Sequence, residues 1–379
     1  MSPSPVQVAK AVDSVMRNKV EDAYLQLERW NEEIEKTRDN CSKLLGVQRD
    51  GVWFVNSTSD GMSIIANGID WERGDNVVMP DIEFPSNVYP FLRKKDLIEV
   101  RYARASYEDE GVEVPLEEVE TLVDDHTKVL CVSAVDFAFG IKYDLKRLAE
   151  IAHPHNAMFV VDGSQAVGAV RMKGAEDMVD VITLGGQKWT LAPSAGGIFY
   201  MNPKLIEKFR PSNVGWMSID SPKDQLTRQY TEHFEFAKDA RRFATGHLNF
   251  PGIIGLGASS KYLLDVGITE IQNEIERLTT YLIRGLDELD FRLLTPRNPR
   301  HRAGIVSFAI DNPQSVIEFL KGFKIIVSGA SQTKGRGVRV SPDFYNTEAE
   351  VHALLRKLRQ LLEERTPRKE YNATLPDRK

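Results

Sequence analysis

The chain has 379 residues, 42% of them hydrophobic, which is enough to bury a large core and suggests two domains. The net charge of −6 comes from interspersed acids and bases, so no surface for nucleic acid or anionic lipid is indicated. No apolar stretch approaches the ~20 residues that span a bilayer, and no signal-peptide core is evident. We expect a cytoplasmic protein that acts on a small molecule and contacts neither nucleic acid nor a membrane.

The elements predicted from the pattern begin with a helical segment over residues 6–43, broken near Arg17-Asn18. Short apolar runs follow, and amphipathic segments at Leu116–Val123 and Leu145–Ala152 alternate with several of them. This alternation predicts a mostly parallel, buried sheet with helices on both faces, whose ligands bind beyond the carboxyl ends of the strands. The predicted strands are Val52–Val55, Val77–Met79, Val129–Val132, Phe159–Val161, Val181–Leu184 and Gly197–Tyr200.

From Gly257 onward the pattern changes to a smaller α+β domain. A long helix is predicted from Ser259 to about Leu289, strands at Gly304–Ile310 and Lys324–Val327, and a helix over Thr347–Arg365. We therefore divide the chain into an N-terminal segment, 1–20, which packs near the small domain, a large cofactor-binding domain, 21–256, and a small C-terminal domain, 257–365. The charged, proline-containing tail, 366–379, is expected to be mobile.

Two residues carry the strongest chemical signal. Asp162 ends a buried strand in Val160-Val161-Asp162-Gly163-Ser164-Gln165, and Lys188 lies in the apolar, glycine-flanked turn Gly185-Gly186-Gln187-Lys188-Trp189. A pyridoxal 5′-phosphate (PLP) site requires such a pair: the aspartate holds the proton on the pyridine nitrogen, and the lysine forms the imine (Schiff base) that stores the cofactor. The alternatives are an aspartate that caps a turn and a lysine that is an ordinary surface group.

Six segments in a fixed order resemble the class V aminotransferase family of fold-type I PLP enzymes, and the resemblance covers about Gly51 to Thr347. This family includes cysteine desulfurases, isopenicillin-N-epimerase-like proteins, kynureninase-like enzymes and amino-acid lyases. The resemblance implies an α/β fold with a mostly parallel, seven-stranded type of sheet flanked by helices, a small α+β C-terminal domain, and a homodimer with shared active sites. The segments are Asn56–Gly61, Glu83–Asn87, Asp162–Gln165, Gly186–Trp189, Asn249–Gly252 and Arg339–Thr347.

The phosphate of the cofactor is expected at the start of the helix that follows Asn56. Free backbone amides there, with the hydroxyls of Thr58 and Ser59, form an anion site, although an ordinary helix cap is the alternative. The resemblance also assigns Gln187 to the phosphate. Gly185 departs from the family pattern, in which a serine or threonine contacts the phosphate, so one such bond is missing or supplied elsewhere.

Other contacts to the cofactor are implied by the resemblance alone. Gln165 would contact its phenolic oxygen, and Phe84 would stack on the pyridine ring without a proton to give. His247 replaces the family's threonine in Gly246-His247-Leu248-Asn249 and could reach a phosphate of the partner subunit. A structural histidine is equally compatible with this position.

On the substrate side, the resemblance assigns Arg339 to the α-carboxylate of an amino acid, for which a planar guanidinium is well suited. Arg336 is its nearest competitor. Asp136 follows a strand end, where it could face the substrate or cap a turn. Trp216 lies in a loop that covers the substrate in relatives, and packing in a core or an interface is the alternative.

The cysteines limit the reaction. Only Cys41 and Cys131 are present, so neither a disulfide framework nor a thiolate metal cluster is available, and no metal site is expected from the histidines. The resemblance implies that a cysteine desulfurase of this family carries a nucleophilic cysteine on the loop ahead of the arginine that matches Arg339. No cysteine lies in the loop that starts at Ser328, so a cysteine desulfurase is less expected. We favour amino-group transfer or epimerisation, with a carbon–sulfur β-elimination lyase as the alternative. A catalytically silent binding subunit is disfavoured, because both Asp162 and Lys188 are present.

Overall fold

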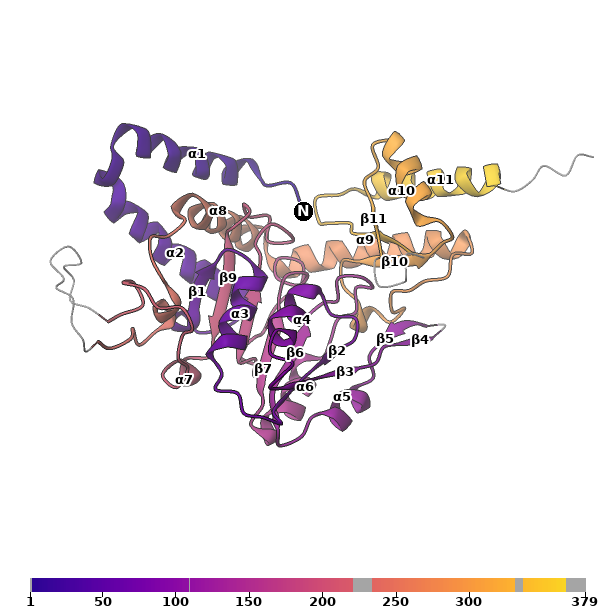
Figure 1. Ribbon diagram of the computed structural model, residues 1–379. Helices are drawn as coiled ribbons and strands as arrows, with labels where there is room; N and C mark the ends of the chain where they lie inside the picture. Colours follow the sequence, from indigo (N-terminus) through magenta and orange to yellow (C-terminus); the bar gives the residue numbers. More distant parts are fainter. Residues whose placement is uncertain (1, 109, 221–233, 331–336, 366–379) are drawn as a thin grey trace, which may run out of the picture.

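The computed structural model describes residues 2–108, 110–220, 234–330 and 337–365 (Figure 1). Arg336, most of the preceding loop and the tail 366–379, which was expected to be mobile, lie outside the described residues.

A mostly parallel, seven-stranded sheet forms the centre of the large domain, as predicted. Five neighbouring strands, from β8 to β3, run parallel, and β9 is antiparallel to both of its neighbours. The order is β1 (Val52–Val55), β9 (Gly197–Met201), β8 (Val181–Leu184), β7 (Met158–Asp162), β6 (Thr127–Ser133), β2 (Asn76–Pro80) and β3 (Glu99–Ala103).

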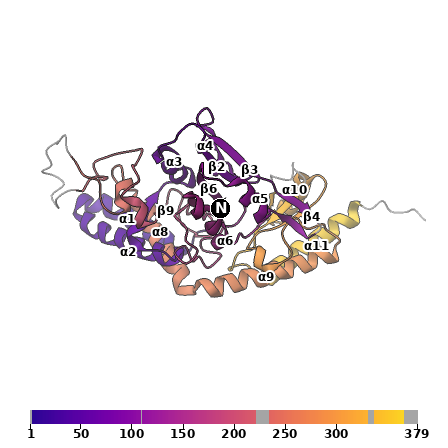
Figure 2. The same ribbon diagram turned by 90° about the horizontal axis from the view of Figure 1, so that it is seen from below.

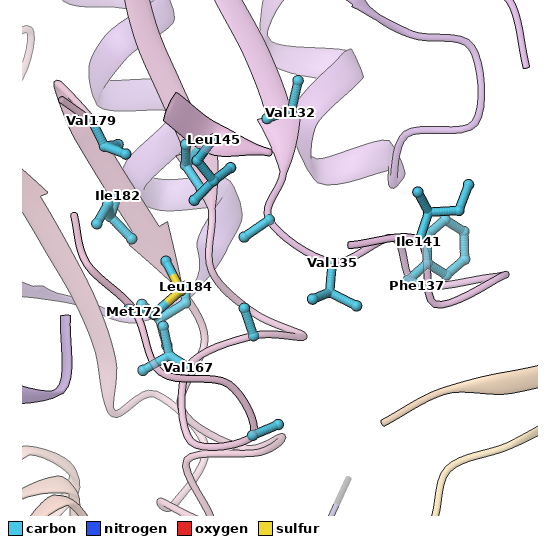
Figure 3. Packing of buried hydrophobic residues seen from close by; sticks show 14 of the residues in the cluster. Val132, Val135, Phe137, Ile141, Leu145, Val167, Met172, Val179, Ile182 and Leu184 are labelled. Atoms are coloured by element: carbon cyan, nitrogen blue, oxygen red, sulfur yellow. The ribbon is translucent and has the colours of Figure 1, made fainter. Parts of the chain in front are cut away.

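Helices cover both faces of this sheet because its strands are apolar on both sides. Along β6, Leu130 and Val132 join one core while Val129 and Cys131 join the other, which is the two-residue period of a strand. The first core includes the cluster in Figure 3 and packs against α2 (Leu27–Leu45), α5 (Leu116–Leu122), α6 (Leu145–Ala152) and α8 (Phe250–Val266). The second packs against α3 (Thr58–Gly68), α4 (Pro85–Leu92) and α7 (Pro203–Ile206).

The small domain has its own core and a three-stranded antiparallel sheet. The sheet order is β10 (Val306–Ala309), β12 (Gly337–Val340) and β11 (Ser328–Gly329), and a separate two-stranded hairpin, β4 (Ser106–Glu108) with β5 (Gly111–Glu113), lies nearby. Three helices cover the sheet: α9 (Ile268–Glu288), α10 (Pro313–Gly322) and α11 (Glu348–Arg365). Figure 2 shows α9 running from beside α8 to α11, so it connects the two domains.

Three predicted element boundaries were wrong. The single helix from Ser259 to Leu289 is two helices, α8 and α9, because Gly267 adopts a φ of 95° between them. No strand forms over Lys324–Val327, where Lys324 has a φ of 62° and the sheet pairing begins only at Ser328. The N-terminal helix α1 (Val6–Glu21) continues through Arg17, whose ion pair with Asp13 supports it.

The helix α1 lies along α8, and its N-terminal end lies toward the centre of the molecule (Figure 1). Ahead of it, the backbone N–H of Ser2 donates to the carbonyl of Gln187 at 3.3 Å. The N-terminal segment thus reaches the turn that contains Lys188.

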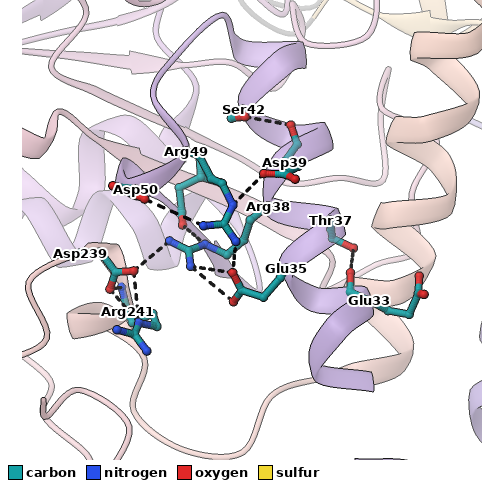
Figure 4. Close-up of polar contacts among 11 residues, drawn as sticks. Glu33, Glu35, Thr37, Arg38, Asp39, Ser42, Arg49, Asp50, Asp239 and Arg241 are labelled. Carbon is teal, nitrogen blue, oxygen red and sulfur yellow. Dashed lines mark hydrogen bonds and ion pairs between the residues drawn. The ribbon is translucent and has the colours of Figure 1, made fainter. Parts of the chain in front are cut away.

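A buried arginine anchors α2 to the large domain (Figure 4). Arg38 is 2% exposed, and its guanidinium donates to the carbonyl of Val52 at 3.0 Å and pairs with Asp239 at 3.1 Å. The same group lies 5.1 Å from the Trp53 ring centroid and pairs with Glu35, which also contacts Arg49. One side chain therefore connects α2 to β1 and to the turn before η4 (Ala240–Phe243).

We expect Arg38→Met to lower the free energy of unfolding by about 3 kcal/mol, because it removes the cation of a buried pair and leaves the Val52 carbonyl without its donor. Urea unfolding measures this change. Arg17→Met is the matched control, since the exposed Arg17–Asp13 pair contributes less than about 1 kcal/mol. Equal losses in the two variants would contradict the anchoring role of Arg38.

Candidate active site

The predicted functional residues gather at the carboxyl edge of the large sheet. β6, β7 and β8 are parallel, so their ends face the same side. In register, Asp162 at the end of β7 is beside Ser133 of β6 on one flank and Thr183 of β8 on the other. Because β8 leads directly into the turn with Lys188, the aspartate and the lysine come from adjacent strands.

Asp162 is buried, with 3% of its surface exposed, and its Oδ1 accepts a hydrogen bond from the Ser164 N–H at 2.8 Å. The turn after it packs against the lysine turn at Gly168, whose φ is 99°. A Cβ atom there would lie 2.2 Å from the carbonyl oxygen of Trp189, so only glycine fits. The two turns are held together by this close approach.

Lys188 is partly buried beside Phe84, with its Nζ 5.1 Å from the ring centroid. Burial lowers its pKa; the charge of Asp162 opposes this shift, and that of Arg339 adds to it. A lowered pKa brings the group closer to the neutral amine that reacts with a carbonyl and accepts a proton.

Gln165 has a fixed orientation. Its Oε1 accepts a hydrogen bond from the indole Nε1 of Trp189 at 2.8 Å. The amide Nε2 is then left as the donor that can meet an anionic oxygen beside Lys188. This fits the contact with a phenolic oxygen that the sequence resemblance implies.

The expected phosphate end lies at the start of α3. Ser57 caps this helix through the N–H of Asp60, and the first-turn N–H groups of Thr58 and Ser59 have no intrahelical acceptor. The Thr58 hydroxyl is within 2.8 Å of the Ser164 hydroxyl and accepts from the Gly185 N–H at 3.0 Å. Thr58 therefore connects all three turns of the site, whereas Ser59 donates to Ser86 at 2.8 Å.

At Gly185, where the family pattern has a serine or threonine, the space beside the backbone is taken by the Gln187 side chain. A Cβ atom on Gly185 would lie 2.7 Å from Oε1 of Gln187, so a side chain there would require the glutamine to move. This Oε1 is buried and has no hydrogen-bond partner among the described residues. A half-turn of the amide would present Nε2 to an anion instead.

Arg339 comes from β12 of the small domain and points into the same cavity as Lys188 and Gln165. Its Nε donates to the Ser328 hydroxyl at 3.0 Å and its Nη1 to the Phe137 carbonyl at 2.6 Å. Burial lowers its pKa, which the charge of Asp136 opposes. A guanidinium held by two partners in a shared cavity can bind a carboxylate next to the lysine with its remaining N–H groups.

Asp136 caps a turn. It is 3% exposed, and its Oδ1 accepts from the N–H groups of Ala138 at 3.0 Å and Phe139 at 2.6 Å. Burial raises its pKa to about 7. The sequence left open whether Asp136 faces the substrate or caps a turn, and these hydrogen bonds are those of a turn cap.

Two predicted residues lie apart from the Lys188 cavity. Trp216, 40% exposed, packs edge-to-face on His247 with ring centroids 5.3 Å apart. His247 lines a second cavity together with Asn56 and Asp60, near the start of α3.

Sequence reasoning gave no role to Glu83. This carboxyl is 6% exposed and accepts hydrogen bonds from both the backbone and the hydroxyl of Ser133. Burial raises its pKa to about 7, against the hydrogen bonds from Ser133 and Asn87, which lower it. Glu83 stands directly before Phe84 in one of the six segments, but no neighbouring residue indicates its partner Ser133.

Among the described residues, no cluster of three His, Cys, Asp or Glu side chains could hold a metal ion. His153 and His155 instead contact Asp180 at 3.0 Å and Asp125 at 2.7 Å. No helix within the described ranges is long and apolar enough to cross a membrane.

The doubly covered sheet, with the buried Asp162 and a Lys188 of lowered pKa at its carboxyl edge, is that of a fold-type I, PLP-dependent enzyme, and the donors at the start of α3 fit the cofactor's phosphate. The family model for aminotransferase class-V matches residues 2–354, so the chain belongs to this family.

Individual relatives differ in their stated activities. A probable cysteine desulfurase of Methanothermobacter thermautotrophicus is 28% identical over 95% of this chain and 92% of its own length. An uncharacterized aminotransferase of Bacillus subtilis is 26% identical over 86% of this chain and 84% of its own.

Solved structures support the fold. The apo cysteine desulfurase from Thermococcus onnurineus NA1 aligns with a TM-score of 0.85 at 24% identity, covering 96% of this chain and 93% of that one. The cystine C–S lyase C-DES, in complex with its product cysteine persulfide, has the same TM-score at 20% identity and covers 94% of both chains. At these identities the likeness shows the fold alone.

Proposed function

We propose that the protein transfers the amino group of a free amino acid, with Lys188 as the proton carrier. The observation that carries this proposal is the shared cavity of Lys188 and Arg339, which puts a base of lowered pKa next to a carboxylate-binding group. PLP, when bound, supplies the electron sink that makes the substrate Cα acidic. Lys188 Nζ would take the Cα proton and deliver it elsewhere in the same site, so amino-group transfer needs no second acid.

The other site residues would act by binding and orientation. Asp162 would keep a proton on the pyridine nitrogen, Gln165 Nε2 would donate to the phenolic oxygen, and the start of α3 would bind the phosphate. Arg339 would bind the substrate α-carboxylate, since Ser328 and Phe137 already hold one side of its guanidinium. Phe84 would stack on the ring and contributes no proton.

A carbon–sulfur β-elimination lyase is the second candidate. It would use the same Lys188 and Arg339, and it requires no protein thiol. The cystine C–S lyase C-DES shows that a protein of this fold can carry out such a reaction.

Desulfuration through a persulfide on the protein fits poorly. Cys41 and Cys131 are both fully buried. Burial raises the pKa of Cys41 to about 12 and that of Cys131 well above its usual value, so neither would supply a reactive thiolate. No other cysteine occurs in the chain.

The test is a panel of L-amino acids, each incubated with and without a keto-acid acceptor. Amine transfer that depends on the keto acid is the expected result. Pyruvate and ammonia from an S-substituted cysteine would instead support the lyase, and Cα racemisation without net product would support an epimerase. A Cys41→Ala/Cys131→Ala variant should retain the activity; sulfide release from cysteine that this variant loses would contradict the exclusion of a protein persulfide.

We also propose that the protein is a homodimer in which His247 reaches the partner's phosphate site. Trp216, which packs on His247, is exposed, as is Val214 two residues before it, and both support an interface on this side. Sedimentation at micromolar concentration tests the dimer, and a monomer that keeps full activity would sink the proposal.

A further inference from the structure

The Glu83 carboxylate accepts hydrogen bonds from two separate segments, the end of β6 and the start of α4. Its Oε1 accepts from the Ser133 N–H at 2.6 Å. Its Oε2 accepts from the Ser133 hydroxyl at 2.7 Å and from the Asn87 amide at 2.6 Å, with the Phe84 N–H at 3.3 Å. The carboxylate therefore ties the end of β6 to the first turn of α4.

Both segments that this carboxylate joins continue directly into the candidate active site. On one side, Phe84 follows Glu83, and its ring faces Lys188 Nζ at 5.1 Å. On the other, the loop from Ser133 to Gly140 contains Phe137, whose carbonyl accepts from Arg339 Nη1 at 2.6 Å. The rings of Phe84 and Phe137 contact each other edge-to-face, with centroids 5.0 Å apart.

The loop from Ser133 to Gly140 is held at two places. On the sheet side, the Ala134 N–H donates to the Asp162 carbonyl at 2.9 Å. On the small-domain side, the carbonyls of Ala138 and Phe139 accept from the hydroxyls of Ser307 at 2.5 Å and Thr295 at 2.6 Å. Phe137 lies between these attachments, so loss of the Glu83 bonds at Ser133 would alter its ring contact with Phe84 and its hydrogen bond to Arg339. Displacements of this kind are costly for catalysis.

We propose that Glu83 is a positioning residue, which sets the ring of Phe84 and the guanidinium of Arg339 relative to Lys188 by tying Ser133 to the start of α4. This inference rests on the proposed function, because that proposal gives Phe84 and Arg339 their roles.

The test compares Glu83→Gln and Glu83→Ala with wild type in the PLP-loaded enzyme. Glutamine keeps the volume but replaces one acceptor oxygen by a donor, which then faces the N–H of Ser133 or the amide of Asn87. We expect the KM for the amino acid to rise roughly 10-fold in Glu83→Gln and roughly 100-fold in Glu83→Ala. The induced circular dichroism of the bound cofactor should fall in the same order, because Phe84 no longer holds the ring in one orientation.

Asp180→Asn is the matched control for a merely structural role. Asp180 is also a buried carboxylate, which accepts from the Phe159 N–H at 2.9 Å and contacts His153, but it precedes β8 at the opposite edge of the sheet. The Asp180→Asn substitution should lower the melting temperature without changing KM or the induced circular dichroism. If the Glu83 variants behave like this control, the positioning role is overturned.

Arg339→Lys in the same assay separates this inference from the proposed function. If Arg339→Lys raises KM and Glu83→Gln changes neither KM nor the circular dichroism, the inference about Glu83 is wrong and the proposed function stands. If Arg339→Lys leaves KM unchanged, the role proposed for Arg339 is wrong, and loss of induced circular dichroism in Glu83→Gln still supports its positioning of Phe84.

Discussion

Replacing Lys188 with alanine should lower turnover by about four orders of magnitude, because the change removes both the covalent anchor of the cofactor and the proton carrier. The desolvated setting of Lys188 beside Phe84, opposite Asp162, is what fits this lysine for both tasks. Turnover with the amino acid selected by the panel measures the loss. The absorbance band of lysine-bound PLP should disappear in the same variant.

Lys142→Ala is the matched control for this substitution. Lys142 is also half-buried with a lowered pKa, but it lines a separate cavity beside Arg302. It should keep turnover within about threefold of wild type, as expected for a residue that takes no part in proton transfer. Comparable losses in the two variants would mean that Lys188 acts only through the stability of the fold.

Replacing Arg339 with lysine should raise the KM for the amino acid about 10- to 100-fold with little change in kcat. A lysine keeps the charge but cannot bind a carboxylate with two parallel hydrogen bonds, and each bond to a charged group contributes about 1.5–3 kcal/mol. Steady-state kinetics on the same substrate measures this split.

Arg302→Lys provides the control for loss of a buried arginine. Arg302 is 8% exposed and has a lowered pKa, yet it lies outside the cavity of Lys188. It should affect thermal stability and leave KM unchanged. An Arg339→Lys enzyme whose kcat falls while KM stays the same would contradict substrate-carboxylate binding and favour a role in the chemical step.

The sheet was predictable because its signal is local. Runs such as Val129–Val132 and Val181–Leu184 are short, apolar and β-branched, and each is a strand in the structure. The break at Gly267 was not predicted, since the apolar periodicity continues across it and a single glycine within a helical pattern is often tolerated. The strand predicted over Lys324–Val327 does not form, because pairing with β12 starts only at Ser328. This pairing depends on the tertiary fold and cannot be predicted from the local sequence.

The residues of the candidate site likewise differ in whether local sequence or tertiary contacts reveal their roles. Asp162 and Lys188 lie in two short motifs whose chemistry can be interpreted from neighbouring residues, whereas the role of Gln165 was implied only by the family resemblance. Glu83 could not be found in this way, because its partner Ser133 is distant in sequence and belongs to another strand. The role of Asp136 could not be decided from the sequence for a similar reason, because only the folded turn shows that its Oδ1 faces backbone N–H groups.

Exchange of the substrate Cα proton in deuterium oxide, followed by proton NMR without any acceptor, tests the central claim most directly. Every reaction considered for this site begins with loss of that proton to Lys188. We predict Cα exchange in the wild-type enzyme, its loss in Lys188→Ala, and its persistence in Lys142→Ala. Exchange that continues unchanged in Lys188→Ala would contradict the account.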